Sequence, residues 1–141
     1  MNSKLKGNIA EAVFTVECLK RDWVVSKPFG DNCRYDAVLD RGKGLERIQI
    51  KSSTFSSSKG VIQAATRRIY NNQTKGSICN TYTKDDIDAF VIYSPELNKL
   101  YYIPIEEQEN KKYLNLRVSA SLKKEVTPKN PSIRWACDYE L

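Results

Sequence analysis

The stretch from Asp88 to Tyr93 (DAFVIY) limits the possible folds of this chain more than any other segment. It is a continuous apolar run of strand length, and a strand of this kind is normally buried on both of its faces. Such a strand needs structure packed above and below the sheet that contains it. The run therefore favours a layered fold with this segment at the centre of a sheet.

The segments before and after this run fit the same fold class. Residues 4–21 carry apolar side chains at helical spacing, and the alternating patterns that follow favour strands. The predicted strands are residues 23–26, 35–40, 45–52, 61–69 and 99–103, with an exposed loop at residues 70–83 and a short charged helix at residues 106–113. This order predicts an α/β fold with a central mixed sheet flanked by helices. A length of 141 residues favours a single domain over residues 1–141.

The chain contains no histidine, which excludes several classes of enzyme. A Ser-His-Asp triad, a Cys-His pair and a zinc site with histidine ligands all require that side chain. Hydrolysis would have to depend on carboxylates, lysine and a cation that prefers oxygen ligands, such as Mg²⁺. The formal net charge of +6 adds a weak indication of a polyanionic partner.

The four cysteines are widely spaced, so reduced thiols are a better interpretation than a zinc site or a disulfide framework. No apolar segment approaches the roughly 20 residues that cross a bilayer, and the first residues lack the pattern of a secretory signal. We therefore expect a cytoplasmic protein with no membrane partner.

A candidate catalytic group lies on the two strands joined by the turn Arg41–Gly44. Asp36 begins one strand, and Gln49 and Lys51 point to the same face of the next strand, about 6.6 Å apart along it. Because the two strands form a tight hairpin, Asp36 can meet this pair. Glu11, on the first helix, can close the site from above.

Three segments with these residues, KGNIAE, PFGDNCRYD and IQIKSS, resemble the PD-(D/E)XK nuclease superfamily. The resemblance is to the small homing endonucleases encoded in group I introns, and it covers about residues 3–55. It implies a restriction-endonuclease-like core, with Mg²⁺ or Mn²⁺ as the cofactor and double-stranded DNA as the substrate.

The resemblance also implies a role for each candidate residue. Asp36 is the central metal ligand, Lys51 the catalytic lysine, Glu11 the accessory acid, and the backbone carbonyl of Ile50 a further ligand. Gln49 takes the position that usually holds an acid, as it does in the intron-encoded branch, and it can offer a metal only a neutral oxygen. Tyr35 stands where the motif has proline.

Other residues are candidates for DNA contacts because cations hold phosphates and amides read base edges. An extended 61–69 segment would lie in the major groove. The candidates are Lys59, Gln63, Arg67, Arg68, Asn71, Asn72, Lys75, Lys123 and Lys124.

The sequence leaves several functions open. A chain with one active site needs a homodimer or homotetramer to cut both strands of a long DNA site. A Holliday-junction resolvase, a restriction-type nuclease and an inactive DNA-binding protein on the same scaffold remain alternatives, the last because of Gln49. An RNA partner is a further alternative, although the closely spaced aromatic pattern of common RNA-binding modules is missing.

Overall fold

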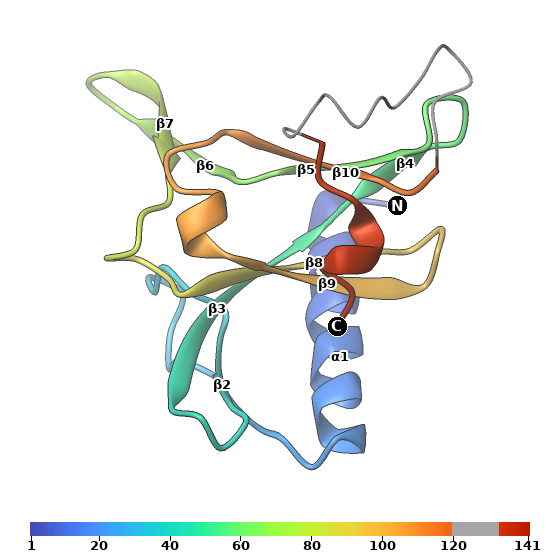
Figure 1. Ribbon diagram of the computed structural model, residues 1–141. Helices are drawn as coiled ribbons and strands as arrows, with labels where there is room; N and C mark the ends of the chain where they lie inside the picture. The colour runs from blue at the N-terminus through green and yellow to red at the C-terminus, as the bar shows by residue number, and fades with distance from the viewer. Residues whose placement is uncertain (120–132) are drawn as a thin grey trace.

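The computed structural model describes residues 1–119 and 133–141, and a five-stranded sheet lies at its centre (Figure 1). The strand order is β1-β2-β3-β8-β9, and β3 and β8 are parallel while the other neighbours are antiparallel. The strands are β1 (Val24–Ser26), β2 (Ala37–Asp40), β3 (Leu45–Ser52), β8 (Ala89–Ser94) and β9 (Lys99–Pro104). Every residue of β8 is buried, as its apolar run predicts. The predicted α/β class with a mixed central sheet is confirmed.

Helix α1 (Ser3–Lys20) covers one face of the central sheet. The side chain of Asn2 caps its first turn, because Oδ1 accepts a hydrogen bond of 2.8 Å from the backbone N–H of Leu5. Ala10, Phe14 and Cys18 lie one turn apart and are fully buried in the core that α1 forms with the sheet. Because these residues pack against the sheet, they fix the position of α1, and of its other side chains, relative to β3.

A second sheet, rather than a second long helix, covers the other face. Its strand order is β10-β5-β4, from β10 (Tyr113–Arg117), β5 (Val61–Ala65) and β4 (Thr54–Ser56). The predicted helix at residues 106–113 is wrong: the segment holds the short 3-10 helix η1 (Ile105–Glu107) and the start of β10. Leu114 and Leu116 are fully buried while their neighbours are not, which is the two-residue period of a strand.

The predicted strand at residues 61–69 is confirmed as extended chain, but it is two strands and not one, because it is divided at Thr66. The Thr66 side chain is fully buried, and its hydroxyl donates to the carbonyl of Lys111 at 2.8 Å. Its backbone N–H donates to the carbonyl of Lys112. These bonds hold the chain at the end of β5 and turn it into a separate hairpin of β6 (Arg67–Asn72) and β7 (Gly76–Thr81). The predicted loop at residues 70–83 is therefore mostly strand, and the hairpin projects from the body of the fold (Figure 1).

The last described residues cover the free edge of the central sheet. The backbone N–H of Tyr102 in β9 donates to the carbonyl of Tyr139, and the N–H of Leu141 donates to the carbonyl of Leu100. The turn η2 (Ala136–Asp138) precedes this contact. Among the residues that the structure describes, α1 is the longest helix, and neither it nor any other is apolar enough to cross a membrane.

Candidate active site

The β2–β3 hairpin places Asp36 beside the middle of β3, as the sequence predicts. The backbone N–H of Asp36 donates to the carbonyl of Ile48 at 2.8 Å, which extends the strand pairing by one residue beyond β2. The N–H of Ile50 donates to Oδ2 of Asp36 at 2.9 Å. The second bond fixes the carboxylate against β3 and leaves Oδ1 available to another partner.

Gln49 and Lys51 share the face of β3 opposite to Ile48 and Ile50. The two isoleucines belong to the core under α1, so the alternation of the strand turns Gln49 and Lys51 the other way. Gln49 is 8% exposed. The Lys51 ammonium lies 5.9 Å from the centre of the Tyr82 ring, which itself packs edge-on against Phe90. The aromatic face thus limits where the ammonium can point.

Glu11 reaches the same site from α1. Its Oε2 forms an ion pair of 3.0 Å with Nζ of Lys27, in the segment after β1. The Glu11 carboxylate also lies near enough to Asp36 to raise the pKa of that residue. Helix α1 and the hairpin therefore bring two carboxylates to one place, and Lys27 partly neutralises them.

Burial shifts both central ionisable groups toward their neutral forms. It raises the pKa of Asp36 above the ordinary 3.8, although the N–H of Ile50 and the charge of Lys51 act in the opposite direction. Burial likewise lowers the pKa of Lys51 below 10.5, while Asp36 raises it and Arg68 lowers it further. The site thus holds a desolvated acid and a desolvated base, an arrangement common in active sites.

The oxygen atoms at this place suit a hard divalent cation. Asp36, Glu11 and the amide of Gln49 supply carboxylate and carbonyl oxygens, which Mg²⁺ and Mn²⁺ accept as ligands. Within residues 1–119 and 133–141, no group of three or more acidic, cysteine or histidine side chains gathers in the geometry of a metal site. That result is consistent with a site of two acids and one amide, in which Gln49 replaces the usual third acid.

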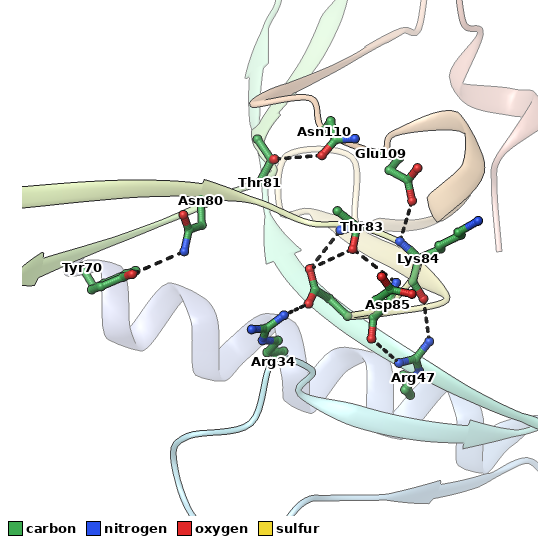
Figure 2. Close-up of polar contacts among 11 residues, drawn as sticks. Arg34, Arg47, Tyr70, Asn80, Thr81, Thr83, Lys84, Asp85, Glu109 and Asn110 are labelled. Atoms are coloured by element: carbon green, nitrogen blue, oxygen red, sulfur yellow. Dashed lines mark hydrogen bonds and ion pairs between the residues drawn. The ribbon is translucent and has the colours of Figure 1, made fainter.

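A polar hollow of about 820 Å³ opens beside the catalytic group. Tyr82 lines it, so the ring that packs over Lys51 also forms part of this wall. Arg68, Tyr70 and Asn80 line it from the β6–β7 hairpin, where Asn80 and Tyr70 lie side by side (Figure 2). Arg34 reaches it from the loop before β2 and is held by the carboxylate of Asp86. The hollow is lined by Arg34, Arg68 and Lys112 as well as Asp86, and Tyr82 connects it to the candidate catalytic residue Lys51.

The predicted DNA contacts are spread over several surfaces. Arg68 is exposed and lines the hollow, whereas Arg67 faces the other side of the hairpin and stacks over Tyr113 at 4.9 Å. Asn71 is exposed and accepts a hydrogen bond of 3.0 Å from the Ser77 hydroxyl, and Asn72 accepts one from Thr74 in the hairpin turn. The remaining predicted contacts are at exposed Lys75 in the same turn, exposed Lys59 and Gln63 near the second sheet, and Lys123 and Lys124, which lie outside the described residues.

Three residues at the site did not emerge from the sequence. Lys27 lies 16 residues from its partner Glu11, and no local pattern links the two. Tyr82 and Arg34 come from segments without regular structure, one after β7 and one before β2. Each acts through a long-range contact, which explains why motif spacing alone could not find them.

The whole chain is similar to known endonucleases. The family of PD-(D/E)XK endonucleases matches residues 1–141, and the chain belongs to that family. A solved structure described as a bacterial homing endonuclease, I-Ssp6803I, is similar, with a TM-score of 0.77 and 28% sequence identity. The match covers 99% of this chain and 89% of that chain. No curated protein matches.

Proposed function

We propose that this chain is a metal-dependent endonuclease that hydrolyses phosphodiester bonds in double-stranded DNA at specific sites, as a homing endonuclease does. The single observation that carries the proposal is that Glu11 and Lys51 lie near enough to Asp36 to act on its charge, with Gln49 on the same strand face as Lys51. Membership of the PD-(D/E)XK endonuclease family supports the chemistry, and the similar homing endonuclease supports the type of target.

The proposed cofactor is Mg²⁺ or Mn²⁺, held by Asp36, Glu11, the side-chain amide of Gln49 and the backbone carbonyl of Ile50. When bound, the ion would polarise the phosphate and favour deprotonation of an attacking water. It would also offset the cost of keeping the Asp36 carboxylate ionised in a desolvated place.

The protein side chains supply the rest of the proposed reaction. The ammonium of Lys51 donates hydrogen bonds to a phosphate oxygen as negative charge grows in the transition state. The Tyr82 ring keeps that ammonium near the reacting phosphate. Lys27 holds the Glu11 carboxylate in position, and Asp36 is held by the N–H of Ile50.

The proposed DNA surface is the hollow together with the β6–β7 hairpin. Arg68 and Arg34 lie around the hollow and would contact phosphates beside the scissile one. Lys75 and Lys59 would add sequence-independent contacts, and Gln63 and Asn71 would read bases. Cleavage of both strands requires two active sites, so the proposed form is a homodimer or homotetramer in the cytoplasm.

The test is selection of cleaved sequences from a randomised DNA pool with Mg²⁺, followed by cleavage of a plasmid that carries the selected site. We expect linear product from the wild type and none from Asp36→Ala or Lys51→Ala. The control is Lys43→Ala, which removes an exposed cation in the turn between β2 and β3. Binding without cleavage in every divalent metal would contradict the proposal and favour an inactive scaffold protein.

Two further substrates separate the related functions. A four-way junction cut without sequence preference would indicate a resolvase in place of a homing endonuclease. Tighter binding to duplex RNA than to duplex DNA would contradict DNA as the substrate.

A further inference from the structure

The outer face of α1 is apolar, although it points away from the protein. Leu5, Ile9, Ala12, Val16 and Leu19 follow one another at spacings of four and three residues, which places them in one stripe along the helix. Leu5, Val16 and Leu19 are 45%, 51% and 64% exposed. Leu5, Ala12, Val16 and Leu19 lie opposite the buried residues of the same helix, where a surface helix normally carries polar side chains. Ile9 is half-buried at the edge of the stripe and also packs against the core.

The order of side chains in this stripe is symmetric about its centre. Leucine stands at both ends, Ile9 and Val16 are β-branched residues in the intermediate places, and the small Ala12 is in the middle. An antiparallel copy of the same helix would bring Leu5 against Leu19 of the second copy and Ile9 against Val16 of the second copy. Ala12 would lie on the two-fold axis, where a small side chain lets two helices approach closely.

The charges beside the stripe suit the same arrangement. In the antiparallel register, Lys6 lies opposite Glu17 of the second copy, and the two-fold axis repeats this pair. Glu17 uses Oε1 to accept from Arg21 at 3.1 Å within its own chain, so Oε2 can accept from lysine. Lys20 lies level with position 4 of the second copy, between Asn2 and Lys6, and opposed helix dipoles favour antiparallel packing.

We infer that this stripe is a self-complementary interface through which α1 pairs antiparallel with α1 of a second copy of this chain. The inference names the contact for the homo-oligomer in the proposed function and rests on that function only for its consequence in DNA cleavage. One endonuclease site per copy would then act on each DNA strand.

The size of the stripe predicts how strong the pairing is. A helix of 18 residues is about 27 Å long and about 10 Å wide, so the stripe covers less than the roughly 800 Å² per partner typical of stable complexes. A groove of about 510 Å³ beside it, lined by Val13, Val16, Leu100 and Leu141 among others, extends the contact. The dimer therefore forms reversibly with protein concentration, and DNA that binds both copies strengthens it.

Cross-linking by engineered cysteines tests the register without any need for cleavage. The background carries serine in place of Cys33, Cys79 and Cys137 and keeps the buried Cys18. Under mild oxidation Ala12→Cys is expected to form a covalent dimer, because this position meets itself. Leu5→Cys alone and Leu19→Cys alone are expected to remain monomers, because each would lie about 21 Å along the helix from its own copy.

The decisive sample is a mixture of the Leu5→Cys and Leu19→Cys proteins, which is expected to give a covalent heterodimer. If each protein formed a covalent homodimer by itself and the mixture gave no excess of heterodimer, the helices would be parallel and the inference would be overturned. Absence of cross-links in Ala12→Cys and in the mixture would overturn it as well.

A polar variant of the stripe gives the functional consequence. Val16→Lys with Leu19→Lys changes two exposed side chains, so the fold is expected to persist by circular dichroism. On a plasmid with the selected site, this variant is expected to nick one strand at a rate near that of the wild type and to lose at least tenfold in linear product. Unchanged linear product in this variant would overturn the inference. If the wild type itself cleaved no DNA, the proposed function would be contradicted, and the cross-linking result would still test the interface.

Discussion

The β2–β3 hairpin and the β6–β7 hairpin are both antiparallel pairs, but the polar side chains are buried at the first and exposed at the second. At the first hairpin Asp36 and Lys51 are withdrawn from water, and burial shifts the pKa of each toward the neutral form. At the second, Arg68, Tyr70 and Asn71 are exposed. In the proposed function, the first hairpin carries the chemistry, which benefits from desolvated charge, and the second carries recognition, which needs side chains open to a partner.

The largest expected effect comes from Lys51→Ala. In the proposed mechanism the Lys51 ammonium stabilises transition-state charge, so its loss is expected to lower the rate of cleavage by about 10²–10³-fold. DNA affinity is expected to change little, because Lys51 lies under Tyr82 instead of on the exposed hairpin. Single-turnover cleavage and equilibrium binding, measured on the same DNA, check this prediction. If DNA binding fell by as much as cleavage, Lys51 would contribute to binding, and the two hairpins would not differ in role.

The exposed hairpin is tested by Arg68→Ala with Arg67→Ala as the matched control. Arg68→Ala is expected to weaken DNA binding by about 1.5–3 kcal/mol, the typical contribution of a hydrogen bond to a charged group, since this guanidinium lines the hollow. Arg67 faces the opposite side of the hairpin and stacks on Tyr113, so its loss is expected to weaken binding less. Binding titrations measure both, and equal losses would show that the hollow is not the surface that matters.

A smaller effect is expected at the turn of the second hairpin. If Lys75 contacts phosphate, Lys75→Ala weakens binding to all sequences and reduces the slope of log affinity against log salt by about 1. Affinity measured over a range of salt concentrations checks this prediction. An unchanged slope would exclude Lys75 from the DNA surface.

The smallest expected effect is a pH dependence of stability at the first hairpin. The folded pKa of Asp36 lies above its ordinary value, so the folded state binds this proton more tightly than the unfolded state. Without metal, its contribution to stability is full below the ordinary pKa and is lost as pH rises through the folded pKa. Asp36→Asn has no ionisable group at this position and does not lose stability in this way. Denaturant unfolding is therefore expected to show that Asp36→Asn is more stable than the wild type at neutral pH but not in acid. Equal pH profiles of stability for the two proteins would contradict the raised pKa of Asp36.

These differences also explain how much the sequence could predict. Asp36, Gln49 and Lys51 were identified because the alternation and the turn define the first hairpin locally, and the structure brings them together with Glu11. The second hairpin was missed because Thr66 interrupts an extended segment through bonds to Lys111 and Lys112, more than 40 residues away. The second sheet was missed for the same reason, since β10 pairs with β5 across a long separation. Local patterns identify strands that end in turns, and they fail where a distant contact decides the boundary.

Mn²⁺ titration followed by electron paramagnetic resonance shows whether Asp36, Glu11 and Gln49 form one cation site, as we propose. The comparison uses wild type, Asp36→Ala, Gln49→Glu and the control Lys43→Ala, each bound to uncut DNA of the selected sequence. We expect Mn²⁺ to bind the wild type and the control alike, to bind Gln49→Glu more tightly because a charge replaces an amide, and to lose its site in Asp36→Ala. Equal Mn²⁺ affinity in all four proteins would contradict a cation site formed by these three residues.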